Sequence, residues 1–358
     1  MNKRICFVSL SNIYLTPYIN KYIDLIEEPY DVIYWNRHRM KEDIKAENYY
    51  SFNLQIEDTA SKAAKLLGYM KFRKFASDVL KKNNYDHVIL LQTIVGVLLR
   101  STLLSKYKWK YILDIRDYTF EKNIIFYKTV EQLVKYSSAN VISSKGYKEF
   151  LPPQNYINVH NDVKIENNTI EEFLKKSRSN DVIRISYIGL IRFLEQNKKV
   201  IMKFKDDPRF RLRFIGKNAK LLENFCVENN INNVDLIDQF PPEMTLHYYG
   251  ETDIINNLYG NNSPLLEYAL SNKLYYASKL RIPILVCKNT YMEQISMKYG
   301  FGYVFDFEDS EACDKLYDYY NSIDWDELKE NCNRFIKLVD SENIKFEEEI
   351  LKIISENQ

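Results

Sequence analysis

The chain has 358 residues, of which 46% are hydrophobic, and its 50 Lys and Arg residues nearly balance 49 Asp and Glu residues. This length and apolar content exclude a disordered chain and predict two domains, at roughly 100–200 residues per domain. The net charge of +1 argues against a general nucleic-acid binder, whose surface usually leaves the whole chain basic.

Charge is nevertheless distributed unevenly along the chain. Residues 1–165 hold 25 basic and 17 acidic side chains, whereas residues 166–358 hold 25 basic and 32 acidic ones. The five cysteines show no CxxC spacing, so the sequence suggests neither a disulfide framework nor a zinc site. No run approaches the ~20 apolar residues that span a bilayer, and the first apolar run is too short for a signal peptide. We therefore expect a cytoplasmic protein.

Short apolar runs alternate with amphipathic, helix-length segments in the first half of the chain. The predicted strands cover residues 4–10, 31–36, 86–92, 110–115, 140–144 and 156–160. The predicted helices cover residues 17–27, 60–82, 95–107 and 124–136. Strands separated by helices imply parallel pairing, because a parallel pair needs a long crossover. Residues 1–165 are therefore predicted to form a Rossmann-like, doubly wound domain.

The same alternation resumes after a polar stretch at residues 164–181, which is expected to be a connector. Predicted strands lie at residues 183–190, 210–216, 234–237, 253–258, 282–287 and 302–307, and predicted helices at 194–204, 219–229, 272–279 and 291–298. Residues 182–335 thus form a second domain, and residues 336–358 a helix expected to pack back on the first. The predicted fold class is α/β, with two Rossmann-like, doubly wound parallel-sheet domains facing a central cleft. Ligands of such sheets bind outside the carboxyl ends of the strands.

The commonest phosphate-binding motifs of this fold class are absent from the sequence. No GxGxxG follows the first strand and no GxxxxGK[ST] occurs, so a phosphate would need cationic side chains and helix N-termini. Gly189 ends a predicted strand, and Arg192 and Lys198 follow at a spacing that lets cations converge on a diphosphate. A turn glycine followed by solvated surface cations explains the same spacing.

Lys273 opens a predicted helix together with Asn272, where the helix dipole disfavours a cation. A bound anion would offset that cost. The alternative is a lysine that reaches away into water, which costs only about 0.3–1 kcal/mol.

The motifs of the second half resemble the donor-binding half of GT-B glycosyltransferases, most closely those that build bacterial capsular and O-antigen polysaccharides. The resemblance covers most of residues 184–307 and rests on Gly189-x-x-Arg192, Arg213-Phe-Ile-Gly216, Asn272-Lys-Leu-Tyr275 and Arg281-Ile-Pro-Ile-Leu285. It implies a nucleotide diphosphate sugar as co-substrate, with no other cofactor and no metal. The residues that it implies at the donor are Gly189, Arg192, Lys198, Gly216, Asn272, Lys273 and Leu274.

Fainter motifs of the same family occur in the first half. Asp114-Ile-Arg-Asp117 and Val159-His-Asn161 are similar to family motifs, which implies that Arg116, His160 and Asn161 lie near the acceptor in the cleft. One departure stands out, because Tyr276 replaces a Glu that commonly contacts the donor. Glu267, about two turns upstream, is expected to take over part of that role.

Asp117 is the best-placed carboxylate for catalysis, since it lies in the loop after a predicted strand. It would act as the general base of an inverting reaction, or position the acceptor hydroxyl in a retaining one. An ion-pair network of Asp114, Arg116 and Asp117 that merely closes the loop is an equally good interpretation. A hydrogen-bonded hinge residue is likewise the simpler interpretation of His160.

A basic segment between residues 59 and 110 points to a membrane. It holds 11 Lys and Arg residues and two acidic ones, interleaved with Leu, Met and aromatic side chains. Basic amphipathic helices bind anionic membrane surfaces, where each cation contributes about 1 kcal/mol. The predicted membrane face consists of Lys71, Arg73 and Lys74. An ordinary packed helix with a solvated cationic face is the alternative.

The sequence therefore predicts a metal-independent glycosyltransferase of bacterial surface polysaccharide synthesis. Its acceptor would be a lipid-linked oligosaccharide, it would lie at the inner face of the cell membrane, and it would have no nucleic-acid partner. A nucleotide-sugar epimerase of GT-B fold and a catalytically degenerate GT-B binding subunit are the alternatives.

Overall fold

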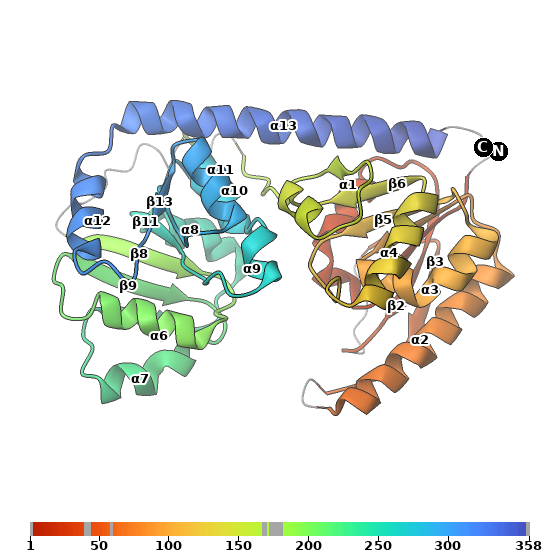
Figure 1. The fold of residues 1–358 in the computed structure, drawn as a ribbon, viewed down its shortest axis with the longest axis horizontal. Helices are drawn as coiled ribbons and strands as arrows, with labels where there is room; N and C mark the ends of the chain where they lie inside the picture. Colours follow the sequence, from red (N-terminus) through yellow and green to blue (C-terminus); the bar gives the residue numbers. More distant parts are fainter. Residues whose placement is uncertain (1–2, 39–43, 58–59, 167–169, 172–181, 356–358) are drawn as a thin grey trace. The chain divides into compact units, whose positions relative to one another are not determined.

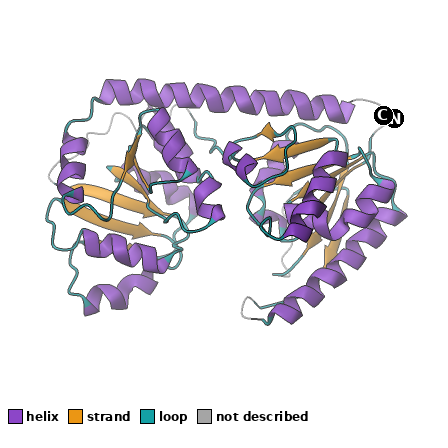
Figure 2. Ribbon diagram, in the orientation of Figure 1, coloured by secondary structure: helices purple, strands orange, loops and turns teal. Residues whose placement is uncertain are grey.

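The computed structural model describes residues 3–38, 44–57, 60–166, 170–171 and 182–355. The chain forms two compact units (Figure 1): unit 1 comprises Met1–His160 and Ser341–Gln358, and unit 2 comprises Asn161–Asp340. Each unit contains a parallel sheet with helices beside it (Figure 2). Most of the connector predicted at residues 164–181 lies outside the described residues.

The sheet of unit 1 has seven strands in the order β3-β2-β1-β4-β5-β6-β7, and every neighbouring pair is parallel. The strands are β1 (Ile5–Ser9), β2 (Tyr30–Trp35), β3 (Asn48–Phe52), β4 (His87–Leu91), β5 (Tyr111–Ile115), β6 (Ala139–Ile142) and β7 (Ile157–Asn158). All residues of β1, β2, β4, β5 and β6 are buried, as expected for parallel strands covered on both faces.

Edge strand β3 is absent from the sequence prediction. Its residues, Asn-Tyr-Tyr-Ser-Phe, are exposed or half-buried and form no apolar run. The strand exists because its backbone pairs in register with β2, from Asp31 opposite Asn48 to Trp35 opposite Phe52. A pairing partner distant in sequence leaves no local pattern to recognise.

Three helices of unit 1 match predicted segments: α2 (Lys62–Lys82), α3 (Thr93–Lys106) and α4 (Ile124–Tyr136). Helix α4 begins where the Asn123 side chain accepts hydrogen bonds from two backbone N–H groups. The helix predicted over residues 17–27 is confirmed only in part. This segment forms one short 3₁₀ turn (Pro17–Ile19) and the four-residue α1 (Asn20–Ile23). Tertiary bonds shape it, since Tyr18 donates to the Leu91 carbonyl at 3.2 Å and Tyr22 to Asp114 at 2.7 Å.

The long helix α13 (Trp325–Ser355) contributes to both units, which divide between Asp340 and Ser341. In unit 1 its last turns join the core that covers one face of β1. Phe346 lies edge-on to Tyr22, with ring centroids 5.2 Å apart, and Ile350 and Ile354 are buried in the same cluster.

The sheet of unit 2 has six parallel strands in the order β10-β9-β8-β11-β12-β13. They are β8 (Ile183–Ile188), β9 (Phe210–Ile215), β10 (Val234–Ile237), β11 (Ile254–Asn257), β12 (Ile284–Val286) and β13 (Gly302–Val304). The helices are α6 (Leu194–Lys203), α7 (Glu223–Glu228), α8 (Thr245–Gly250), α9 (Pro264–Tyr268), α10 (Asn272–Leu280), α11 (Tyr291–Lys298), α12 (Ala312–Asn321) and the first half of α13. Two buried apolar clusters hold these layers together. In both units the strand ends therefore carry the loops on which a site can be built.

Candidate active site

The predicted glycines Gly189 and Gly216 lie side by side at the carboxyl ends of β8 and β9. The Gly189 N–H donates to the Ile215 carbonyl at 2.8 Å, and the Gly216 N–H donates to the Ile237 carbonyl at 2.8 Å. Both have positive φ, +122° and +136°. A Cβ on Gly216 would lie 2.0 Å from the Gly189 carbonyl oxygen, so only glycine fits there. The two glycines thus leave bare backbone at strand ends, where open α/β sheets bind ligands.

Lys273 reaches this same place from the first turn of α10. Its ammonium donates to the Ile188 carbonyl at 2.5 Å, and a Cβ on Gly189 would lie 3.9 Å from Nζ. The rings of Tyr187 and Tyr259 lie 4.1 Å and 5.5 Å from Nζ, so the cation sits over two aromatic faces. The side chain is only 5% exposed, which rules out the solvated lysine considered above.

Burial lowers the pKa of the Lys273 ammonium to about 8. No carboxylate pairs with it among the described residues. A buried cation without a counter-ion is costly, and an anion next to Gly189 would recover that cost through charge-assisted hydrogen bonds. Tyr187 and Tyr259 escaped the sequence prediction, although Tyr187 stands only two residues before Gly189.

The other predicted donor cations lie on the connection between β8 and α6. Arg192 is exposed, and its carbonyl accepts a hydrogen bond from the Asn197 side chain at 2.6 Å. Lys198 donates to Glu195 at 2.8 Å and lies 5.5 Å from the Phe225 ring. The convergence of Arg192, Lys198 and Lys273 on a diphosphate stays a prediction.

Two further predicted donor residues flank Lys273 on α10. Asn272 is exposed at the first position of the helix and is available to a ligand. The structure corrects the prediction for Leu274, which is fully buried in the apolar core of unit 2. Its side chain packs the helix against the sheet and does not reach a ligand.

Glu267 and Tyr276 lie on different helices. Glu267 belongs to the short α9, is half-buried, and forms no side-chain hydrogen bond or ion pair within the described ranges. Extended residues separate α9 from α10, and the part that Glu267 would take in donor binding stays a prediction. The Tyr276 ring stacks on Tyr249 with centroids 4.4 Å apart, so it packs where the resembling family has a carboxylate.

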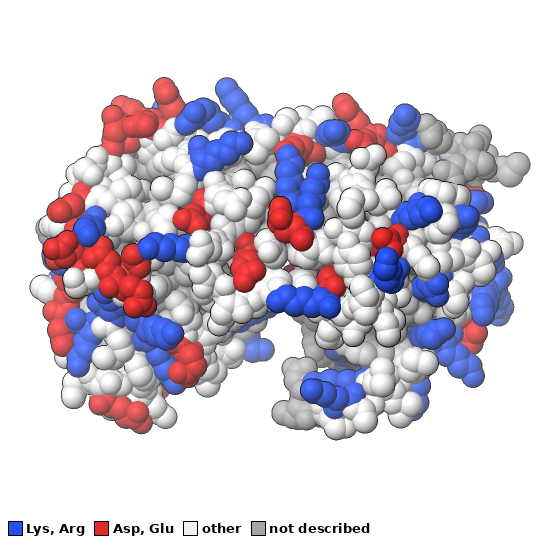
Figure 3. All heavy atoms as spheres, in the orientation of Figure 1, with Lys and Arg blue, Asp and Glu red and all other residues white. Residues whose placement is uncertain are grey.

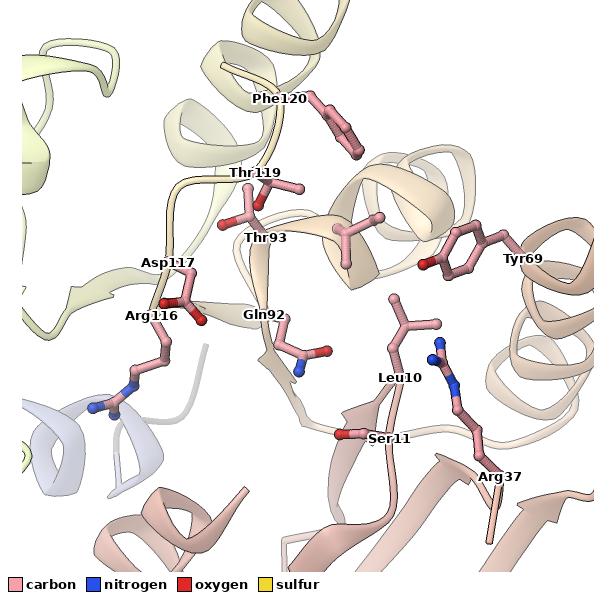
Figure 4. A pocket seen from close by; sticks show the side chains of 11 residues that line it. Leu10, Ser11, Arg37, Tyr69, Gln92, Thr93, Arg116, Asp117, Thr119 and Phe120 are labelled. Carbon is pink, nitrogen blue, oxygen red and sulfur yellow. The ribbon is translucent and has the colours of Figure 1, made fainter. Parts of the chain in front are cut away.

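Unit 1 contains a pocket of about 330 Å³ at the carboxyl ends of its central strands. Asp117 lies on its wall and is exposed to it (Figure 4). The remaining lining residues come from the segments after β1, β2, β4 and β5 and from α2: Leu10, Ser11, Arg37, Tyr69, Gln92, Thr93, Ile94, Arg116, Thr119 and Phe120. The lining therefore combines a carboxylate, two arginines and several hydroxyl groups with apolar side chains.

Arg116, which precedes Asp117, is held by a buried ion pair. Its Nη2 donates to Asp114 at 2.7 Å, and its guanidinium lies 4.3 Å from the Tyr18 ring centroid. Burial lowers the pKa of this guanidinium, but Asp114 raises it by more. Figure 4 shows the Arg116 guanidinium pointing away from the other lining side chains. The Asp114–Arg116 part of the predicted network is therefore present, and it anchors the loop that carries Asp117.

His160 is 3% exposed and does not line the pocket. Its Nε2 lies 2.9 Å from Glu342 of α13, and its backbone N–H donates to Asn343 at 3.0 Å. Burial raises the pKa of Glu342, but hydrogen bonds from His160, Lys145 and Asn158 bring it down to about 2. Unit 2 begins at the next residue, the half-buried Asn161. His160 is thus buried and hydrogen-bonded at the boundary of the two units, and its place near the acceptor stays a prediction.

Comparison with known proteins reveals similarity at the level of structure alone. No family model matches the chain, and no curated protein matches its sequence. Sucrose-phosphate synthase from Thermosynechococcus elongatus matches with a TM-score of 0.71 at 10% identity, over 96% of this chain and 97% of that one. HepE from Anabaena, solved in complex with UDP, matches with a TM-score of 0.65 at 10% identity, over 96% and 98%. The lipopolysaccharide outer core galactosyltransferase WaaB matches with a TM-score of 0.66 at 14% identity, over 96% and 98%.

These neighbours are GT-B glycosyltransferases, and they match both parallel sheets along almost the whole chain. The chain has the GT-B fold. The predicted α/β class with two doubly wound parallel-sheet domains is thereby confirmed.

The predicted membrane face of this GT-B chain lies on α2. Lys71 and Lys74 are exposed and Arg73 is half-buried. Figure 3 shows Lys and Arg side chains gathered along α2 in unit 1 and acidic side chains near α12 in unit 2. The outer side of α2 also exposes three apolar side chains, Leu66, Leu67 and Met70. The inner side is packed, since Phe72, Ala76 and Leu80 are fully buried.

Two further findings bear on the predicted partners. None of the helices in the described ranges combines the length and the apolar content that crossing a bilayer requires. The described residues also contain no group of three or more His, Cys, Asp or Glu side chains that would suit a metal ion.

Proposed function

We propose that the protein is a metal-independent glycosyltransferase that transfers a sugar from a nucleotide diphosphate sugar to a glycan acceptor. The observation that carries the proposal is the buried Lys273 ammonium beside Gly189 and Gly216 on a GT-B scaffold. This arrangement offers a positive charge and bare backbone at strand ends, which suits a leaving diphosphate. The complex of HepE with UDP makes UDP and UDP-sugars the first donors to test.

Calorimetric titration with UDP tests the donor site. Replacing Lys273 with Met removes a charged hydrogen-bond donor of similar length, and such bonds are worth about 1.5–3 kcal/mol. UDP affinity should therefore fall by about 10- to 100-fold. Lys279→Met is the matched control on the same helix, because that ammonium already binds the Val163 carbonyl at 2.6 Å. Equal UDP affinity in all three proteins would refute the donor site.

Asp117 is proposed to act on the acceptor hydroxyl. If it is the general base, Asp117→Asn should lower kcat by about 10²–10⁴-fold and leave UDP affinity unchanged. Asp78→Asn, at an exposed position of α2 outside the pocket, is the control. Wild-type turnover in the Asp117 variant would remove this residue from the mechanism.

The acceptor is proposed to be a lipid-linked oligosaccharide of bacterial surface polysaccharide synthesis, reached from the inner face of the cell membrane. The mixture of basic and apolar side chains on α2 supports this, because it is the pattern of interfacial helices. Removing three cations, each worth about 1 kcal/mol at an anionic surface, should weaken binding about a hundredfold at low salt. Flotation with anionic vesicles measures this in the variant Lys71→Gln, Arg73→Gln, Lys74→Gln.

The matched control removes three exposed lysines of unit 2: Lys220→Gln, Lys329→Gln and Lys337→Gln. The difference between the two triple variants should shrink as salt rises, since screening weakens surface charges. Equal flotation of both variants and the wild type would reject α2 as the membrane face.

A second candidate function is a catalytically degenerate binding subunit, which the packing of Tyr276 against Tyr249 supports. Such a subunit would bind UDP in a Lys273-dependent way without turning over any nucleotide sugar. A nucleotide-sugar epimerase would instead convert the donor with no acceptor present. Product analysis with and without acceptor separates these two functions from glycosyl transfer.

A further inference from the structure

We infer that the acceptor bound in the pocket of unit 1 carries a negatively charged group, a phosphate or a carboxylate, which Arg37 and the first turn of α3 hold. The inference deepens the proposed transferase function and rests on it for identifying the ligand as the acceptor. The anion site itself is argued from the pocket alone.

Arg37 supplies the positive charge of this pocket. Its guanidinium lies 4.4 Å from the ring centroid of Trp35, which is itself buried at the end of β2. The guanidinium donates no hydrogen bond to any of the described residues, and its Nε is buried without a partner. A guanidinium presents a planar set of donors that matches the oxygens of a phosphate or a carboxylate. Arg37 is thus held in place by an aromatic face while its donors remain unused.

The N-terminus of α3 adds a second, independent feature. This 14-residue helix starts directly after Gln92 and has no side-chain cap, and its first two residues, Thr93 and Ile94, line the pocket. Thr93, the first residue, is 2% exposed and lines the pocket, and its hydroxyl has no hydrogen-bond partner. Free N–H groups, the helix dipole and an unpaired hydroxyl together favour an anionic oxygen. A buried hydroxyl is costly when left unpaired, so a ligand that bonds it gains affinity.

Asp117, which is proposed to act on the acceptor hydroxyl, lines the same pocket as Arg37 and Thr93. Figure 4 shows Arg37 and Tyr69 on one side of the pocket and Asp117, Thr93 and Gln92 on the other. A volume of about 330 Å³ is at the small end of ligand pockets, which span roughly 300–1,000 Å³. It suits a single sugar residue with a charged substituent, so that one hydroxyl lies toward Asp117 and the charge toward Arg37.

The pocket should therefore discriminate between charged and neutral acceptors. A neutral sugar offers the guanidinium and the Thr93 hydroxyl only uncharged hydroxyl oxygens. Hydrogen bonds to ionised partners are roughly twice as strong as those between neutral groups, so a charged oxygen should bind Arg37 more tightly. Sugars with a carboxylate and sugars with a phosphate both offer charged oxygens to these donors, and the experiment tests one sugar of each kind.

The test measures binding to the full chain by calorimetry, with glucose 6-phosphate, glucuronate, glucose and inorganic phosphate as probes. We expect both charged sugars to bind at least about tenfold more tightly than glucose or inorganic phosphate. Arg37→Gln should abolish this preference and Thr93→Val should weaken it. Removing an unpaired buried hydroxyl should not lower the Tm, so a loss of binding in Thr93→Val will not reflect unfolding.

Two control variants assign the binding to this pocket. Arg100→Gln changes an exposed guanidinium of α3 that already bonds Gln132, and it should bind the probes as the wild type does. Lys279→Met, which changes an ammonium of unit 2 that already bonds the Val163 carbonyl, should also keep the preference. The inference is wrong if glucose binds as tightly as the charged sugars, if inorganic phosphate does, or if Arg37→Gln leaves the preference intact.

These measurements involve no turnover, so the two proposals can fail separately. Preference for charged sugars that depends on Arg37, without any glycosyl transfer, would overturn the proposed function and keep the anion site. Transfer to neutral acceptors at an undiminished rate in Arg37→Gln would overturn the anion site and keep the transferase.

Discussion

Replacing Lys273 with Met should make the free protein more stable at neutral pH. The pKa of this ammonium falls from its ordinary 10.5 to about 8 on folding, because burial removes its hydration. A difference of this size corresponds to about 3 kcal/mol at 1.36 kcal/mol for each tenfold change. Losing the charged hydrogen bond to the Ile188 carbonyl takes back about 1.5–3 kcal/mol. We therefore expect the free energy of unfolding to rise by up to about 1.5 kcal/mol at pH 7.

The direction in which stability changes with pH follows from the protonation state of Lys273 in the folded and unfolded chains. Below pH 8 both the folded and the unfolded chain carry the proton on Lys273, and the folded state bears the full cost of the buried charge. Between pH 8 and 10.5 the unfolded chain still holds the proton and the folded chain has released it, so stability rises with pH. Relative to the Met variant, the wild type should gain about 2 kcal/mol between pH 7 and pH 9.5.

Urea unfolding followed by circular dichroism, at pH 7 and pH 9.5, measures both effects. The difference between the two proteins isolates Lys273, since every other titratable group is common to both. Lys279→Met is again the control: its ammonium lies 3.5 Å from Asp162, so its removal should not stabilise the protein. The reasoning is refuted if Lys273→Met is no more stable than the wild type at pH 7 and the difference is the same at both pH values.

Two further substitutions test the local geometry. Gly216→Ala should lower the free energy of unfolding by at least about 2 kcal/mol, because its Cβ would collide with the Gly189 carbonyl at a positive φ. Gly260→Ala is the control, because Gly260 also has a positive φ of +96° but a Cβ there would have no atom closer than 3.8 Å. This variant should lose clearly less free energy of unfolding in the same urea titration. Equal losses in the two variants would contradict the proposed collision. Glu342→Gln should destabilise the protein above pH 4.5, where the wild-type carboxylate is charged. Folding lowers the pKa of Glu342 to about 2, so the difference in free energy of unfolding between variant and wild type should shrink by about 2 kcal/mol between pH 7 and pH 3. A difference that stays constant with pH would refute the role of the Glu342 hydrogen bonds.

The sequence by itself determined most of the succession of strands and helices, and with it the fold class. Helices α4 and α11 and strand β10 begin and end at the predicted residues. Buried strands and amphipathic helices leave a periodic apolar pattern, which is a local property that a single chain displays. The absence of glycine-rich phosphate motifs directed attention to Lys273 and Gly189, which do lie together.

Only the tertiary structure decided what surrounds these residues. Lys273 is buried against Tyr187 and Tyr259, and its ammonium bonds a carbonyl 85 residues away in the sequence. The partner of His160, Glu342, is 182 residues away. The burial of a side chain, its pKa and its hydrogen-bond partners depend on which distant segments pack against it. The spacing of residues in the sequence does not show which segments these are. The sequence could therefore nominate Asp117, but the guanidinium that shares its pocket became visible only when the strand ends were assembled.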